Sequence, residues 1–136
     1  MDQSQVILIN MTPWHGPSMD IGTAMEAGYM YRRAKEAGVL LIGYYEGAHT
    51  KSFSQRVTEK VYQGAVTTDK DGNITGSDGM AVEAFDLTDN LMVPGAIKES
   101  GGQIFDSFEK AASKITALWE AKQALVAEAG ATAEPK

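Results

Sequence analysis

Two carboxylates and two glycines are closely spaced between Asp20 and Tyr29: Asp20, Gly22, Glu26 and Gly28. An ionised carboxylate can attack the anomeric carbon of a sugar and form a covalent glycosyl ester. On a helix, Gly22 lies one turn before Glu26 on the same face, and its missing side chain leaves room for a sugar to approach. The spacing therefore predicts glycosyl chemistry at Glu26, with Asp20 available to hold a sugar hydroxyl.

The elements around this segment place it where α/β proteins bind ligands. The apolar run 6–11 reads as a buried strand. A helix is predicted over about 21–37, with Asp20 or Ser18 as its N-cap and Gly38 placed to end it. The turn from a strand to a helix lies at the carboxyl end of the sheet, which is the usual ligand edge of such folds.

The pattern inside this helix gives three further expectations. Its apolar positions, at a spacing of three to four, predict the buried face: Ile21, Ala24, Met25 and Gly28. Gly28 costs a helix about 1 kcal/mol relative to Ala, so we expect it to permit close packing on the sheet. Glu26 lies within the first two turns, where the helix dipole favours an anion.

The rest of the chain continues the alternation of strands and helices. After a second buried strand at 39–45, the sequence predicts a short helix at 54–63, a turn at 68–76 between short extended pieces, a helix at about 90–99, a strand at 102–105, a helix to about 128 and a disordered tail at 129–136. This order predicts one domain, residues 1–128, with a three-layer α/β architecture and a mostly parallel sheet. Three main strands would leave one flank open, to be covered by a strand from residues 64–84 or by oligomerisation.

Two motif blocks resemble those of a known family. The first is Asn10-Met11-Thr12-Pro13 with Gly16-Pro17, followed by Asp20-x-Gly22-Thr23-Ala24-x-Glu26-x-Gly28-Tyr29; the second is Asn90-Leu91-Met92 after an Asp-Leu pair. In this order they resemble the signature of the nucleoside 2-deoxyribosyltransferase family. The resemblance covers roughly residues 5–118 and is loose over about 46–81. The strand and helix with which this family normally begins have no counterpart here, so the chain looks like an N-terminally shortened member.

The resemblance implies a fold, an activity and a set of site residues. The fold would be flavodoxin-like or Rossmann-like, and the activity the transfer of 2-deoxyribose between nucleobases through a covalent intermediate on Glu26, with retention. Asp20 and Gly22 would contact the deoxyribose, and Asn90 with Met92 would reach the 5′-hydroxyl end from a neighbouring subunit. The implied partners are nucleosides, free nucleobases and further copies of the same chain.

Several alternatives stay open. Water could resolve the same intermediate, which would give a hydrolase of nucleosides or nucleoside monophosphates, and a shortened chain could bind nucleosides without turnover. Glu26 taken alone could be a solvated surface residue, and Asp20 and Asn90 could be only helix caps. Trp14 could stack on a base, although a Trp in a loop bounded by prolines is more often packed against its own domain. The preference for purines or pyrimidines stays open as well.

The composition and net charge of the chain argue against several classes of function. A chain of 136 residues with 43% hydrophobic residues can build one core. A net charge of −6 argues against binding a nucleic-acid polymer, which requires a basic surface. Two histidines and no cysteine indicate no metal site, and no cofactor is expected. The sequence has no apolar run of 18 residues, so we expect no membrane partner and a cytoplasmic location.

Overall fold

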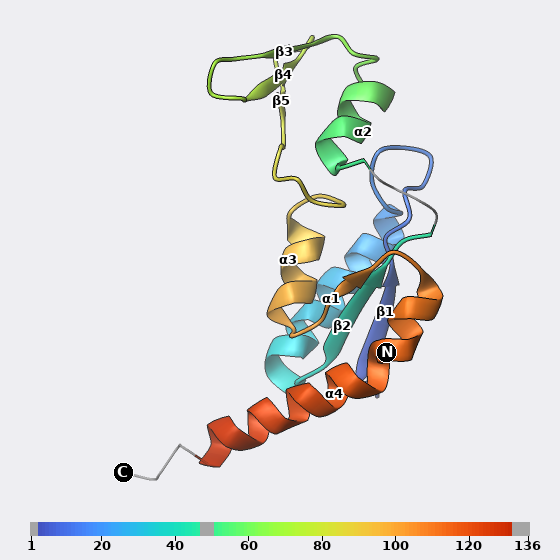
Figure 1. The fold of residues 1–136 in the computed structure, drawn as a ribbon, viewed down its shortest axis with the longest axis vertical. Coiled ribbons are helices and arrows are strands. Elements are labelled where there is room, and N and C mark those ends of the chain that lie inside the picture. The colour runs from blue at the N-terminus through green and yellow to red at the C-terminus, as the bar shows by residue number, and fades with distance from the viewer. Residues whose placement is uncertain (1–2, 47–50, 132–136) are drawn as a thin grey trace.

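A computed structural model describes residues 3–46 and 51–131, and the side chains among these up to residue 127. The elements are β1 (Val6–Asn10), α1 (Ile21–Ala37), β2 (Leu40–Tyr44), α2 (Phe53–Lys60), β3 (Val66–Thr68), β4 (Ile74–Gly76), β5 (Ala81–Val82), α3 (Met92–Glu99), β6 (Ile104–Phe105) and α4 (Phe108–Ala131). The predicted order of strands and helices is confirmed. Figure 1 shows the main body below and a smaller part, with α2 and β3–β5, above it.

The main sheet is parallel and has the strand order β1-β2-β6. β1 and β2 pair along their whole length, from Val6 opposite Leu40 to Asn10 opposite Tyr44. β2 is the central strand, and its apolar residues 40–42 are fully buried because both faces of the sheet are covered. The expected parallel α/β sheet of three main strands is thus present.

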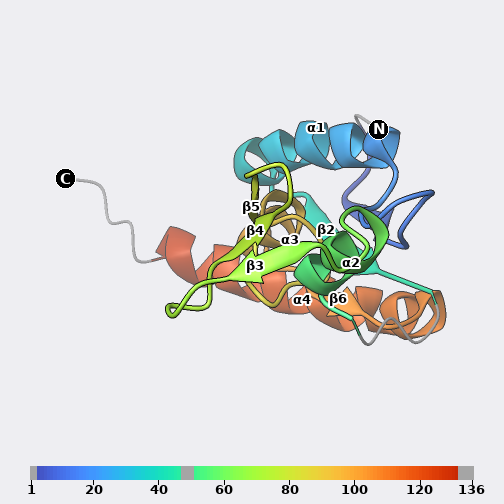
Figure 2. The same cartoon turned by 90° about the horizontal axis from the view of Figure 1, so that it is seen from above.

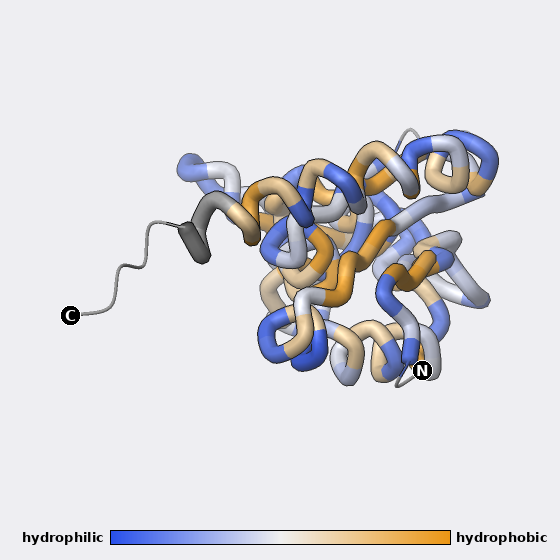
Figure 3. Tube along the Cα trace, turned by 90° about the horizontal axis from the view of Figure 1, so that it is seen from below, coloured by the Kyte–Doolittle hydropathy of each residue, from blue (hydrophilic) through white to orange (hydrophobic). Residues whose placement is uncertain are grey.

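Helices cover the two faces of this sheet and give it three layers (Figure 2). On one face, α1 and α3 pack on Ile9 and Leu41 through Met30 and Ile97. On the other face, Ala111 of α4 packs on Leu40 and Ile42. The most hydrophobic stretches of the chain accordingly lie between the layers, and the peripheral loops are polar (Figure 3).

Local signals at both ends set the bounds of α1, and both were predicted correctly. The Asp20 side chain accepts a hydrogen bond of 2.9 Å from the backbone N–H of Thr23, which satisfies one of the free donors of the first turn. Gly38 follows the last turn with φ 68°, a left-handed conformation that glycine adopts without strain.

The predicted buried face of α1 was wrong at three of its four positions, and only Ala24 packs against the core. Ile21 and Met25 are 79% and 73% exposed, and the buried residues of the helix are Ala27, Met30 and Ala34. Ala27 and Ala34 have small side chains, so the helix axis can approach the sheet closely. With these residues toward the sheet, the larger side chains of Ile21 and Met25 point to solvent. Gly28 also lies on the outside: a Cβ added there would meet nothing within 4 Å, so it does not serve packing on the sheet.

Residues 64–84 form a separate structure and do not cover the flank of the main sheet, contrary to one of the two expected solutions. β3, β4 and β5 make a small antiparallel sheet of their own. It lies above the main body beside α2, on the side where the main strands end (Figure 1). The turn predicted at 68–76 is present but shorter: it covers 69–73, because β3 ends at Thr68 and β4 begins at Ile74.

Helix α4 is longer than predicted. Ser107 accepts a hydrogen bond from the N–H of Lys110 at its start, and the helix continues to Ala131. Its last turns extend beyond the sheet, as Figure 1 shows, and there Leu125 is 67% exposed. Of the tail predicted to be disordered, residues 129–131 belong to the helix and residues 132–136 lie outside the described part of the chain.

Candidate functional site

The two motif blocks meet near the carboxyl ends of the parallel strands. The loop that follows β1 leads to Asp20 at the start of α1, and the segment before α3 lies beside this loop. The Asp20 carboxylate lies close to Gly22, since a Cβ at that position would be 3.0 Å from Asp20 Oδ2. Any larger residue at position 22 would therefore press against this carboxylate, which also caps α1.

A buried aspartate joins the two blocks. Asp89 is 1% exposed, and its carboxylate accepts three hydrogen bonds from two segments. From the first block, the hydroxyl of Ser18 donates to Oδ1 at 2.5 Å and the N–H of Met19 donates to Oδ2 at 2.9 Å. The N–H of Asn90, in the second block, donates to Oδ1 at 2.8 Å. Asp89 therefore fixes the position of Asn90 relative to the loop that carries Asp20.

A buried arginine of α2 also binds the loop before α1 and the segment before α3. Arg56 of α2 is 5% exposed, and its guanidinium donates to three carbonyl oxygens: Pro17 at 2.7 Å, Lys51 at 2.7 Å, and Thr88. Burial lowers the pKa of Arg56 from its ordinary value, and the nearby carboxylate of Asp89 acts in the opposite direction. The arginine thereby ties the loop before α1, the segment before α3 and helix α2 into one unit.

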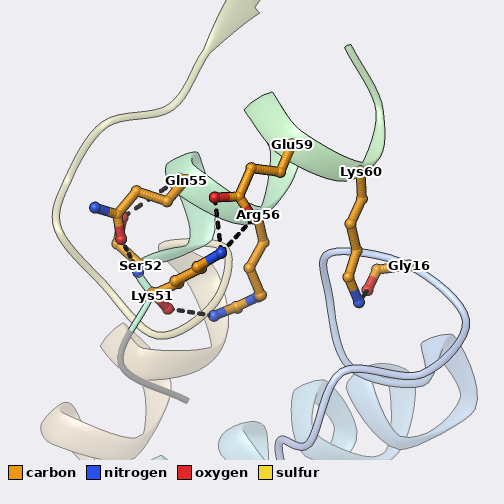
Figure 4. A network of polar contacts seen from close by, with 7 residues as sticks. All are labelled: Gly16, Lys51, Ser52, Gln55, Arg56, Glu59 and Lys60. Atoms are coloured by element: carbon orange, nitrogen blue, oxygen red, sulfur yellow. Dashed lines mark hydrogen bonds and ion pairs between the residues drawn. The ribbon is translucent and has the colours of Figure 1, made fainter. Parts of the chain in front are cut away.

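Helix α2 has a second attachment to the loop before α1. Figure 4 shows the side chain of Lys60 reaching the carbonyl oxygen of Gly16, at 3.0 Å, and the guanidinium of Arg56 beside Lys51. The start of α2 is fixed by Ser52 and Gln55, which form a reciprocal capping box. The part of the molecule above the sheet is therefore anchored on the loop that leads to the candidate site.

Glu26 lies on an open flank of α1. It is exposed, and within the described residues its carboxylate has no hydrogen bond or ion pair. Gly22 and Tyr29 share this flank, because they lie four residues before it and three residues after it. An exposed carboxylate one turn after a glycine, and about 1.7 turns after Asp20, can be reached by a small molecule.

Met92 lies on a different flank. A groove of about 390 Å³ runs between α1 and α3, and Gly28, Leu91 and Met92 line it together with other residues of the two helices. Met92 is 76% exposed at this groove. Gly28 is two residues after Glu26, about 200° further around the helix, so Glu26 and Met92 face opposite sides of α1 within one copy.

Asn90 acts locally on the start of α3. Its side-chain oxygen accepts a hydrogen bond of 3.1 Å from the N–H of Met92, and its amide nitrogen donates to Glu83 at 3.1 Å. These two bonds hold Asn90 just before α3, but the N-cap position is Leu91 and no side chain caps the helix, so the capping alternative for Asn90 is wrong. They leave its second oxygen lone pair and second N–H available for a ligand.

Trp14 stands in the loop that follows β1. The loop is closed by a hydrogen bond of 2.9 Å from the N–H of Trp14 to the carbonyl oxygen of Ser18. The Trp14 ring is 64% exposed and meets the ring of His15 edge to face, with centroids 4.5 Å apart. The alternative that Trp14 is packed into its own domain is wrong, and its exposed face is available for stacking.

The sequence did not reveal Asp89 and Arg56, which hold this site together. The only local signal was an aspartate directly before the expected start of α3. For the described part of the chain, no group of three or more His, Cys, Asp or Glu side chains could hold a metal ion. None of the helices, over the same residues, is both long enough and apolar enough to cross a bilayer.

Comparison with known proteins gives one distant relative. No family model matches the chain. An uncharacterized protein of Schizosaccharomyces pombe is 30% identical over 93 residues, which cover 68% of this chain and 44% of that protein. The chain therefore spans less than half the length of this relative.

Proposed function

We propose that the chain transfers 2-deoxyribose between nucleobases, with Glu26 as the nucleophile. The observation that carries the proposal is the junction at Asp89, because it brings the two motif blocks together at the ligand edge of a parallel sheet. The resemblance of these same blocks to the nucleoside 2-deoxyribosyltransferases supplies the reaction.

The proposed reaction has two steps. The Glu26 carboxylate attacks the anomeric carbon of the donor nucleoside, the C–N bond breaks, and the base leaves after taking a proton from water; the acceptor base returns a proton to water when its own N–C bond forms. A second base then attacks the deoxyribosyl ester, so that Glu26 is released and the configuration at the anomeric carbon is retained. Asp20 and Gly22 would contact the sugar, and Trp14 would stack on a base.

The placement of Met92 supports a site made by two copies. Because Met92 and Glu26 face opposite sides of α1, both can touch one sugar only if they come from different copies. The resemblance implies the same arrangement, with Asn90 and Met92 reaching the 5′-hydroxyl end from a neighbour.

The test is base exchange. The purified chain is incubated with deoxyinosine or thymidine as donor and adenine as acceptor, and nucleosides, bases and deoxyribose are separated by chromatography. We expect deoxyadenosine from the parent and none from Glu26→Ala. Glu36→Ala is the matched control, because Glu36 is an exposed glutamate on the same helix that makes an ion pair with Arg32.

The products distinguish the alternatives. Free base and deoxyribose without deoxyadenosine would show that the reaction is hydrolysis and not transfer. Deoxyadenosine formed equally by Glu26→Ala would refute Glu26 as nucleophile. Mass spectrometry of the parent with donor alone should find one deoxyribosyl group on the peptide that contains Glu26. Absence of turnover, together with binding of nucleosides, would favour a non-catalytic binding protein.

A further inference from the structure

We infer that the chain binds an unbranched aliphatic carboxylate, such as octanoate, in a groove on the side of α3 that faces β6. This groove has a volume of about 520 Å³, which lies in the usual range for small-molecule sites. It is distinct from the groove between α1 and α3, and we call it the Lys98 groove. The inference does not depend on the proposed function.

The walls of the Lys98 groove are mostly apolar. Pro94 and Ile97, two buried residues of α3, form one side, and Ile104 of β6 lies on the other. Leu87 and Leu91 line the part of the groove next to the start of the helix. Walls of this kind bind a hydrocarbon chain, because its apolar surface leaves water when it enters the groove.

The polar side chains of the groove are gathered at one end. Lys98 lies in the last turn of α3 and Gln103 directly before β6, where the chain turns back into the sheet (Figure 1). Leu91 lies at the opposite end of α3. From Leu91 to Lys98 the helix rises about 10 Å. The groove therefore fits an extended apolar chain that carries a hydrogen-bond acceptor at one end.

The charges around this end favour an anion. Within the described residues, the ammonium of Lys98 has no ion pair. A second ammonium, that of Lys122 in α4, lies 2.6 Å from the carbonyl oxygen of Ser100. The nearby carboxylate of Glu99 is neutralised by Lys35, at 2.6 Å. The end of α3 thus carries excess positive charge, although the chain as a whole has a net charge of −6.

The carbonyl groups at the end of α3 do not oppose this charge. Free carbonyl oxygens at a helix C-terminus repel an anion. Here the oxygen of Ile97 accepts bonds from the N–H of Gly102, at 3.0 Å, and from the hydroxyl of Ser100, at 2.7 Å. The oxygen of Lys98 accepts a bond of 3.0 Å from the N–H of Gly101. Donors of the chain therefore occupy these oxygens, and the Lys98 side chain is left to bind a ligand.

A carboxylate on an alkyl chain matches both ends of the groove. Its two oxygens can accept hydrogen bonds from the ammonium of Lys98 and from the amide of Gln103. An alkylamine would be repelled by Lys98, and an alcohol would forgo the charge. Of the residues that line the groove, Lys98 alone carries a charge, which suits an anion with a single charge.

The first test measures how affinity depends on chain length. Butyrate, hexanoate and octanoate are titrated into the purified chain, and Kd is determined by calorimetry. While the groove buries the added CH₂ groups, each pair of them should tighten binding roughly 15-fold. Octanol and octylamine, which have the same chain without the carboxylate, should bind more weakly than octanoate.

The second test removes the charge. Lys98→Gln keeps a long polar side chain and should weaken octanoate about two- to fivefold, because an exposed ion pair contributes little. Its affinity for octanol should equal that of the parent, which separates loss of the charge from loss of the groove. Lys70→Gln is the matched control, because Lys70 is an exposed lysine on the turn between β3 and β4. It should bind both ligands as the parent does.

The third test locates the ligand. In nuclear magnetic resonance spectra, octanoate should move the backbone amide signals of Lys98, Gly102 and Gln103. The signal of Gly28, which lines the groove between α1 and α3, should stay in place.

Four results would overturn the inference. They are movement of the Gly28 signal without movement at Gly102 and Gln103, an affinity that does not depend on chain length, equal affinities of the parent and Lys98→Gln for octanoate, and no saturable binding of octanoate at its highest usable concentration. A Lys98→Gln variant that loses octanol as well would also count against the assigned role of the charge.

Discussion

The carboxylate of Asp89 should contribute more to stability than any exposed acidic residue nearby. Asp89→Asn keeps the shape of the side chain and replaces one oxygen by an NH₂ group. The best orientation keeps the oxygen toward Ser18 and Asn90 and turns the NH₂ toward the N–H of Met19. Two donors then face each other in a site where Asp89 is 1% exposed.

The cost follows from the lost bond. A hydrogen bond to a charged group contributes about 1.5–3 kcal/mol, and a buried donor left without a partner costs a similar amount. These two figures describe the same loss, so we expect the free energy of unfolding to fall by about 2–3 kcal/mol. For a chain of this length, each kcal/mol lowers Tm by about 3–5 °C, which gives a decrease of about 10 °C.

Thermal and urea unfolding followed by circular dichroism measure the effect. Asp86→Asn is the matched control, because Asp86 lies three residues earlier, is exposed, and has φ 57°, a conformation that Asn also adopts readily. Its unfolding free energy should change by less than about 0.5 kcal/mol. Equal stabilities of Asp89→Asn and Asp86→Asn would refute the role of Asp89 at the junction of the two blocks.

Three other predictions concern the capping residue, two glycines and one ion pair. Asp20→Ser should retain the N-cap of α1 and unfold within a few tenths of a kcal/mol of the parent, yet lose base exchange if Asp20 holds the sugar; full activity of a stable Asp20→Ser would leave the residue a cap alone. Gly28→Ala should raise the free energy of unfolding by up to about 1 kcal/mol, because alanine favours a helix over glycine and its Cβ would meet nothing. Gly102→Ala should leave the chain unfolded, because its Cβ would lie 1.6 Å from a carbonyl oxygen of β2; urea titration measures both effects. The hydrogen bond and ion pair with Lys35 lower the pKa of Glu99, so the pair stabilises the fold fully above the ordinary pKa of 4.5 and progressively less as the pH falls through the lowered pKa. In urea titrations, the free energies of unfolding of the parent and of Glu99→Gln should therefore differ at neutral pH and become equal in acid.

Signals confined to a few residues were sufficient to predict the main elements. Asp20 and Gly38 set the ends of α1, since a capping carboxylate and a left-handed glycine act within one turn. The apolar run of β2 was read correctly because a central parallel strand is buried on both faces. In such cases the sequence neighbours and the spatial neighbours are largely the same.

Features that depend on distant contacts could not be predicted. Asp89 bonds to Ser18 across 71 positions of the chain, and no local pattern distinguishes it from an exposed aspartate such as Asp86. The buried face of α1 was missed for a related reason. Ile21 and Met25 are more hydrophobic than Ala27 and Ala34, but close approach to the sheet favours the small side chains.

The two flanks of α1 limit how the proposed site can be built. Glu26 lies on one side of the helix, and Met92 lies at the groove between α1 and α3 on the other side. One copy therefore cannot bring both residues to the same sugar, and the proposed function requires the groove of one copy to meet the Glu26 side of another. Met92 is 76% exposed, so Met92→Glu should leave the circular dichroism spectrum of the chain unchanged and abolish base exchange. Full base exchange by a folded Met92→Glu variant would refute a site shared between copies.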